Sequence, residues 1–178
     1  MHPRFQWMAV AALMAVTSTA HGAAQDLVVQ VPQLSHAAAV QLVDACITIE
    51  AKANIPAAVA VVDPAGQLMH FDALQGASPT APRTALLKAE TAARWRRSTA
   101  QLSDEIKKGG NSESIYLGDF PVPGGVPIVQ GTHTLGAIGV SGPGDDNGCA
   151  LAAVKAVFGD SVTTGRALGN GGGVQPRP

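Results

Sequence analysis

Two β-hairpin signals separated by helical stretches constrain the fold of this chain more than any other feature. A short apolar run over residues 57–62 ends at Asp63-Pro64-Ala65-Gly66, and a second run over 67–73 follows. Pro at the second turn position and Gly at the fourth are typical of a type I turn. Similar runs over 126–130 and 134–141 predict the second hairpin. Strands joined by such tight turns pair antiparallel.

Helical periodicity surrounds both hairpins. Apolar residues recur at three- and four-residue steps, and polar caps precede several of these stretches. The predicted helices cover 35–54, 83–97, 99–108 and a last segment that is capped by Asp145 or Asp146 and ends at Gly159. We therefore predict an α/β fold, in which one antiparallel sheet of two hairpins is flanked by helices.

Alternation along the strand predicted over 67–73 assigns side chains to the two faces of the sheet. Leu68, His70 and Asp72 are expected on one face, with Met69 and Phe71 on the other.

Glycine marks two further features of the chain. Gly136 and Gly139 interrupt the last predicted strand, which indicates a bulge or a close approach of another group to the backbone. The Gly- and Pro-rich stretch 111–125 is predicted to be irregular. Because long structureless segments are uncommon in compact domains, we expect this one to be functional.

The N-terminus is typical of a secretory signal. A weakly basic start with His2 and Arg4 precedes an apolar run over 7–16, and small residues fill 17–24. That run is shorter than the ~20 apolar residues of a membrane-spanning helix. We therefore expect a signal peptide over 1–24, a periplasmic or secreted protein and no membrane association after cleavage. A single domain over 25–162 and a flexible tail over 163–178 follow from the same composition.

Charge and cysteine content restrict the class of partner and the state of the thiols. The net charge is −1 and no basic patch is present, so we expect no binding of nucleic acid. The short cluster at 94–97 is read as a solvated helical turn. Cys46 and Cys149 are either a disulfide, which export would favour, or two small buried residues.

Several motifs, taken together, resemble the GlcG/HbpS family over residues 36–160. They are Val61-Val62-Asp63, Lys88-Ala89-Glu90-Thr91-Ala92, Gly124-Gly125-Val126-Pro127-Ile128, the run 136–142, Asp146 and Cys149-Ala150. The resemblance implies a profilin-like α/β/α sandwich, a homo-oligomer between dimer and octamer, and haem as the small-molecule ligand. Haem degradation or redox buffering are the activities it suggests, and whether the chain is an enzyme stays open.

The resemblance also implies a haem pocket. Its walls would be the start of the helix over 83–97, the strand over 67–73 and the loop that contains Gly124 and Gly125. Lys88 would face a propionate, with Thr91 nearby as a donor.

His70 replaces the arginine that many relatives place two residues before Asp72. An imidazole can ligate a metal, so His70 is the candidate iron ligand. Asp72 would hold its second ring nitrogen.

Simpler interpretations stand beside these roles. Lys88 could be an exposed helix residue and His70 a surface side chain, while His133 fits a solvated turn and His36 a helix cap. Zinc-finger spacing and a nucleophile elbow are both missing, which disfavours a structural zinc site and an ordinary hydrolase.

Two rival functions remain. The chain could be an enzyme or binding protein for a small organic acid, with Lys88, Asp72 and His70 as binding or acid–base groups. It could also be a ligand-free accessory protein of a secreted oxidoreductase.

The family's fold would place the first and last helices side by side. Because Cys46 and Cys149 lie on the faces predicted to be buried, the resemblance favours a disulfide between them, provided that their Cα atoms lie within about 7 Å.

Overall fold

The computed structural model describes residues 29–110 and 112–165. The predicted signal peptide lies outside the described residues, as does the predicted tail beyond residue 165. The chain divides into Met1–Val31 and Pro32–Pro178, and all described helices and strands belong to the second unit. Among the residues that the structure describes, no helix is long and apolar enough to cross a membrane.

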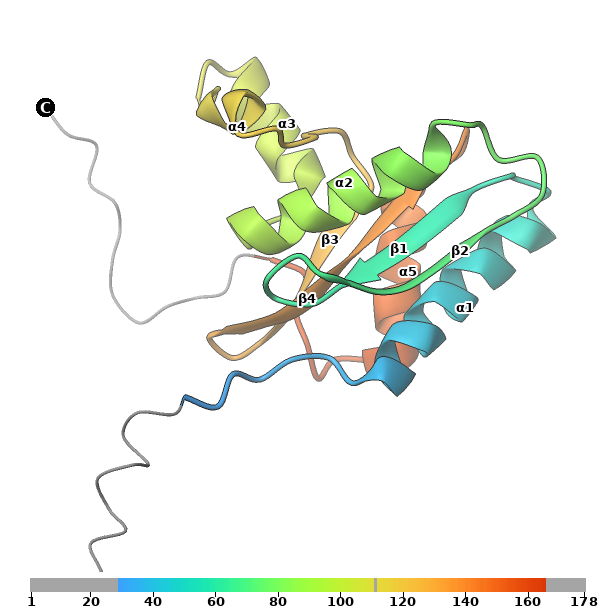
Figure 1. The fold of residues 1–178 in the computed structure, drawn as a ribbon, viewed down its shortest axis with the longest axis horizontal. Helices are drawn as coiled ribbons and strands as arrows, with labels where there is room; N and C mark the ends of the chain where they lie inside the picture. The colour runs from blue at the N-terminus through green and yellow to red at the C-terminus, as the bar shows by residue number, and fades with distance from the viewer. Residues whose placement is uncertain (1–28, 111, 166–178) are drawn as a thin grey trace, which may run out of the picture. The chain divides into compact units, whose positions relative to one another are not determined.

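One antiparallel sheet with strand order β2-β1-β4-β3 forms the centre of the second unit (Figure 1). The elements are α1 (His36–Lys52), β1 (Ala58–Val62), β2 (Leu68–Ala73), α2 (Ala81–Trp95), α3 (Thr99–Lys107), α4 (Glu113–Tyr116), β3 (Gly125–Gln130), β4 (His133–Ser141) and α5 (Asp146–Phe158). The predicted fold class is confirmed. The single turn α4 lies in the segment predicted to be irregular, because one turn is too short to show a period.

Local hydrogen bonds fix the ends of these elements. The Ser35 side chain accepts from Ala38 N at 3.1 Å and begins α1, and Asp145 accepts from Gly148 N at 2.9 Å and begins α5. Such side-chain caps satisfy N–H groups that have no partner inside the helix. In the first hairpin, Asp63 Oδ1 accepts from the backbone of Ala65 and Gln67, which holds the predicted turn.

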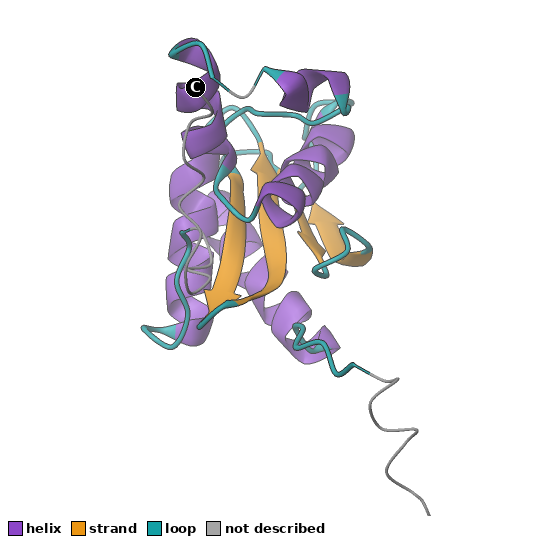
Figure 2. Ribbon diagram, turned by 90° about the vertical axis from the view of Figure 1, so that its left-hand side faces the viewer, coloured by secondary structure: helices purple, strands orange, loops and turns teal. Residues whose placement is uncertain are grey.

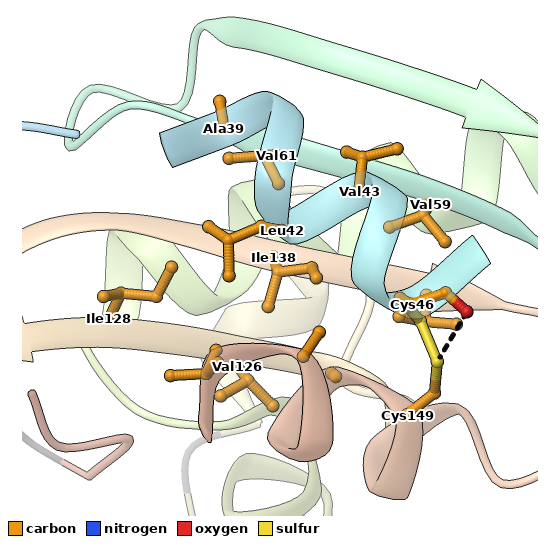
Figure 3. Close-up of a cluster of buried hydrophobic side chains, with 14 of the residues drawn as sticks. Ala39, Leu42, Val43, Cys46, Val59, Val61, Val126, Ile128, Ile138 and Cys149 are labelled. Carbon is orange, nitrogen blue, oxygen red and sulfur yellow. Dashed lines mark hydrogen bonds between the residues drawn. A yellow bond between two sulfur atoms is a disulfide. The ribbon is translucent and has the colours of Figure 1, made fainter. Parts of the chain in front are cut away.

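Helices cover both faces of the sheet (Figures 1 and 2). One face packs against α1 and α5 through large aliphatic side chains, among them Leu42, Val43, Val59, Val61, Val126, Ile128 and Ile138 (Figure 3). The other face is covered by α2, and the contact is made mainly by alanines, from the strands (Ala58, Ala60 and Ala137) and from α2 (Ala85 and Ala89). Small side chains on this face let the backbone of α2 approach the strands closely.

A register shift corrects the predicted faces of β2. His70 pairs with Val61, which belongs to the core under α1, whereas Leu68 pairs with Val62, which faces α2. The bulge between these pairs adds one residue to β2, so Leu68 and His70 point to opposite faces. The prediction that they share a face was wrong, because strict alternation assumes a regular strand.

The two glycines of β4 have the two roles that the sequence predicts. Gly136 lies at a register shift between β3 and β4 and has φ +154°. Gly139 lies under α2, where an added Cβ would be 2.1 Å from the Ala85 carbonyl oxygen. One glycine therefore accompanies a bulge and the other permits close packing of a helix.

Candidate functional site

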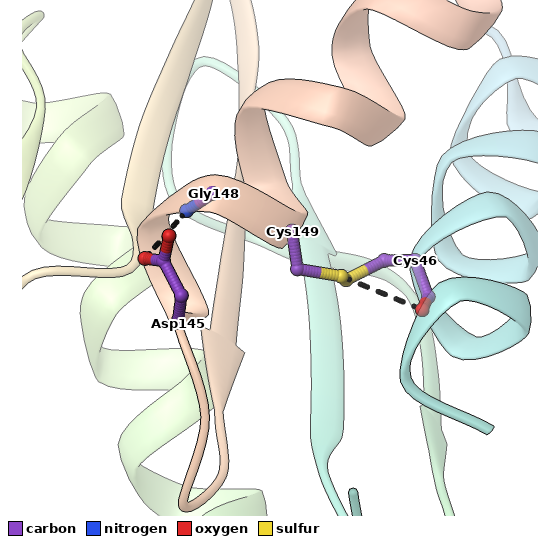
Figure 4. The surroundings of a disulfide bond; sticks show 4 residues. All are labelled: Cys46, Asp145, Gly148 and Cys149. Carbon is purple, nitrogen blue, oxygen red and sulfur yellow. Dashed lines mark hydrogen bonds between the residues drawn. A yellow bond between two sulfur atoms is a disulfide. The ribbon is translucent and has the colours of Figure 1, made fainter. Parts of the chain in front are cut away.

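Cys46 and Cys149 form a disulfide that joins α1 to the first turn of α5 (Figure 4). Their Cα atoms are 5.6 Å apart, within the range that a disulfide requires. The disulfide favoured by the resemblance is confirmed. Cys149 Sγ also lies 3.4 Å from the Cys46 carbonyl oxygen, a packing contact in the oxidised state.

Lys88 is buried where α2 meets β4, so the interpretation of Lys88 as an exposed helix residue is wrong. Its Nζ donates to Asp146 Oδ2 at 2.6 Å and to the Val140 carbonyl at 2.9 Å. Burial raises the pKa of Asp146, an effect that the ammonium of Lys88 opposes. These contacts connect α2, β4 and the start of α5. The ammonium group that the resemblance assigns to a propionate is therefore already paired with Asp146.

Thr91 and its neighbours on α2 hold the long loop before β3. Thr91 Oγ1 accepts from Phe120 N at 2.9 Å. Asp119 is buried and accepts from Arg94 Nη1 and Trp95 Nε1, each at 2.6 Å. The cluster at 94–97 is therefore not simply a solvated turn, because Arg94 and Trp95 donate to a buried carboxylate.

Gly124 and Gly125 lie where α2, α3 and α5 meet the sheet. A Cβ on Gly125 would be 2.3 Å from the Lys88 carbonyl oxygen, and one on Gly124 would be 2.8 Å from Asp146 Cβ. The Gly125 N–H donates to Thr99 Oγ1 at 2.8 Å. These contacts explain both glycines by close packing.

His70 and Asp72 lie elsewhere, on the edge strand β2. His70 faces α1, and its ring centroid lies 5.9 Å from that of His36 in an edge-to-face arrangement. Asp72 Oδ1 accepts from Ala73 N at 2.7 Å. The expected hydrogen bond from His70 to Asp72 is absent among the residues that the structure describes. There, the imidazoles of His70 and His36 both lack a hydrogen-bond partner.

The structure thus separates the six predicted site residues into two groups. Lys88, Thr91, Gly124 and Gly125 meet under α2 at the β3 side, whereas His70 and Asp72 lie on β2. Because β2 and β3 are the two edges of the sheet, one chain does not form the single pocket that the resemblance implies. His133, in the turn region of the second hairpin, is exposed as expected.

Two residues near these groups could not be selected from sequence. His36 meets His70 only through the packing of α1 on β2, and no spacing along the chain signals that contact. Glu50 is 3% exposed, and its Oε2 has no hydrogen-bond partner within the described chain. Burial, reinforced by the charges of Asp146 and Asp145, raises the pKa of Glu50.

Comparisons with known proteins agree with this fold. The family model described as haem degrading protein HbpS-like matches residues 34–155. An uncharacterized 15.0 kDa protein of Citrobacter freundii is 30% identical over 120 residues, which cover 64% of this chain and 82% of that protein. Protein GlcG of Escherichia coli K12 is 31% identical over 90 residues, covering 51% of this chain and 67% of GlcG.

Solved structures share the arrangement of elements. The crystal structure of HbpS is 28% identical with a TM-score of 0.68, covering 74% of this chain and 94% of HbpS. A complex of PduOC with haem is 24% identical, also with a TM-score of 0.68, covering 75% of this chain and 99% of that one. At that identity the second likeness shows the fold alone.

Proposed function

The chain belongs to the family of haem degrading HbpS-like proteins, and from that premise we propose that it is an exported haem-binding protein with His70 as its iron ligand. The resemblance recognised in the sequence is confirmed by the family match. Haem is the ligand named for the PduOC relative and in the description of the family.

The observation that carries the proposal is the pair of imidazoles at the α1–β2 edge. His36 is the first residue of α1, and His70 lies in β2 with its ring centroid 5.9 Å away. The two rings are in direct edge-to-face contact, so they cannot lie on opposite faces of one haem. We therefore assign His70 alone as the axial ligand, with His36 packed beside it.

The surroundings of this pair fit a haem iron. Neither ring has a hydrogen-bond partner or an ionic partner in the described part of the chain, so a nitrogen lone pair can bind a metal. His36 is exposed and His70 partly so, which leaves both rings accessible to a ligand from solvent. A single axial histidine is enough for haem, and the bound iron would supply redox chemistry.

The group around Lys88 supports this proposal less well. Its ammonium is paired with Asp146, and the Gly125 N–H is taken by Thr99, so an added anion would compete with both contacts. The same contacts count against a small organic acid at Lys88. Asp72, already bonded to Ala73 N, lies beside the proposed site without a ligand role.

Export is supported by the oxidised cysteines. Disulfides persist in the periplasm and outside the cell and are rare in the cytosol. The bond between Cys46 and Cys149 fits the destination that the N-terminal sequence predicts, so we propose a periplasmic or secreted protein.

Titration of haem into the purified protein, followed at the Soret band, tests the proposal. His70→Ala should shift the band and weaken binding, and His36→Ala should have a smaller effect on affinity. His133→Ala is the matched control, because it removes an exposed imidazole away from β2. No spectral change with wild-type protein, or an unchanged spectrum and affinity in His70→Ala, would exclude the assignment.

A further inference from the structure

A second group of metal-binding atoms lies on the same side of the sheet, at the junction of α1 and α5. The ligand atoms of Cys46, Glu50 and Cys149 all lie within 4.8 Å of one another, and all three residues are buried. Cys46 and Glu50 are one helical turn apart on α1, which places them on one face. Cys149 comes from the first turn of α5.

One polar atom at this junction, Glu50 Oε2, lacks a hydrogen-bond partner among the described residues. This oxygen is buried, and Asp145 and Asp146 face Glu50 from α5. A buried carboxyl oxygen without a partner costs free energy, and a cation between the carboxylate and two thiolates would remove that cost. In the oxidised protein the two sulfurs carry no charge and are poor ligands.

We propose that reduction of the Cys46–Cys149 disulfide converts this junction into a binding site for a thiophilic divalent cation such as Zn²⁺, held by two thiolates and the Glu50 carboxylate. Thiolate and carboxylate oxygen are both zinc ligands, and three protein ligands leave a fourth position for water.

The reaction balances with a dithiol as the reductant. The dithiol gives two electrons and two protons to the disulfide, the S–S bond breaks, and the dithiol becomes a disulfide. The cation then displaces the two thiol protons and is bound by the two thiolates and the Glu50 carboxylate. Reoxidation reverses these steps and releases the metal, so metal binding follows the redox state of the surroundings.

The loop before α5 offers access for the ion. Residues 143–145 are exposed, and a Cβ added to Gly144 would lie 3.6 Å from Glu50 Oε2. An exposed residue without a side chain therefore lies beside the carboxylate. The site uses none of the histidines assigned to haem, so the two proposals succeed or fail separately.

Binding of Co²⁺, a spectroscopic substitute for Zn²⁺, tests the inference on the full chain. A phosphine reductant is used because it adds no thiolate. Reduced protein should bind one Co²⁺ with a sulfur-to-cobalt charge-transfer band, and oxidised protein should show none. Glu50→Gln should weaken binding by more than about tenfold, since even loss of an outer contact costs that much.

Asp44→Asn, on the exposed side of α1, is the control and should bind as the wild type does. Circular dichroism reports whether the reduced protein stays folded. Absence of the band in reduced protein, or equal affinity in Glu50→Gln, overturns the proposal. A reduced protein that unfolds and does not refold with Co²⁺ overturns it too.

Discussion

Lys88 Nζ lies 2.6 Å from Asp146 Oδ2, and this ion pair fastens α2 to the start of α5. The Lys88 side chain is 3% exposed and that of Asp146 14%. A second contact, from Lys88 Nζ to the Val140 carbonyl oxygen, adds β4 to the same junction. The lysine of the family-like motif thus holds three elements together in this chain.

Removing Lys88 alone should destabilise the protein strongly. Lys88→Met leaves Asp146 buried without its partner, and breaking a buried pair in this way costs about 3–5 kcal/mol, less here because Asp146 keeps some solvent contact. Urea unfolding measures the change. The double variant Lys88→Met/Asp146→Leu should recover much of the loss.

Lys107→Met is the control for this comparison. Lys107 lies 3.7 Å from Asp104 in a pair that is mostly exposed, and such pairs contribute about 0–1 kcal/mol. If Lys88→Met proves as mild as Lys107→Met, the Lys88–Asp146 pair has no structural importance.

Gly139→Ala should also destabilise the fold, through packing rather than charge. The new Cβ would be 2.1 Å from the Ala85 carbonyl oxygen and 2.5 Å from Ala89 N, both backbone atoms of α2. The helix would have to move off the sheet, and overpacking of this kind costs about 1–3 kcal/mol or more. Gly110→Ala, with its nearest contact at 3.5 Å, should change the thermal midpoint little. Equal midpoints in the two variants would contradict the close approach of α2.

The hairpins, the helices and the order of elements could be predicted because local signals specify them. Asp63 and Gly66 encode a turn, and Ser35 encodes a cap, within a few residues of chain. The bulge that moves Leu68 to the other face has no such signal, since it arises from pairing between β1 and β2.

The candidate site was less accessible to sequence reasoning because its contacts are tertiary. His70 could be selected by its chemistry, yet its neighbour His36 is distant in sequence and was assigned to a cap. The motif identifies Lys88, but its partner Asp146 follows only from the fold, which brings the start of α5 and the end of β4 to Lys88. Motifs therefore identified residues, and the fold decided which of them meet.

Loss of the disulfide should reduce stability by an amount that reflects its long loop. Cys46 and Cys149 are 103 residues apart, and the chain-entropy estimate for such a loop is about 4–5 kcal/mol. Denaturant unfolding of oxidised wild type and of Cys46→Ala/Cys149→Ala measures the difference. Equal unfolding midpoints would show that the bond forms without constraining the unfolded chain.

Self-association remains a prediction that light scattering can test. Ile115, Tyr116, Leu117 and Val122 are large apolar residues exposed in and after α4. Burial of such residues against a second copy would stabilise a symmetric oligomer. We expect a mass between dimer and octamer at micromolar concentration, and a smaller mass for Tyr116→Asp. A wild-type monomer would refute this expectation.

The buried carboxyl of Glu50 should make stability depend on pH in one direction. Burial and the charges of Asp146 and Asp145 raise its folded pKa above the ordinary value of 4.5. As pH rises above that value, the unfolded chain releases this proton while folded Glu50 retains it, so the folded state binds more protons and wild-type stability falls. Glu50→Gln has no proton to lose, and its stability relative to the oxidised wild type should therefore rise with pH and level off above the folded pKa. Below the ordinary pKa the free energies of unfolding of the two proteins should differ by a constant amount.

Exposed Glu113→Gln serves as the control in urea unfolding across this range. A Glu50→Gln profile parallel to that of the wild type would show that Glu50 ionises as freely in the folded protein as in the unfolded chain.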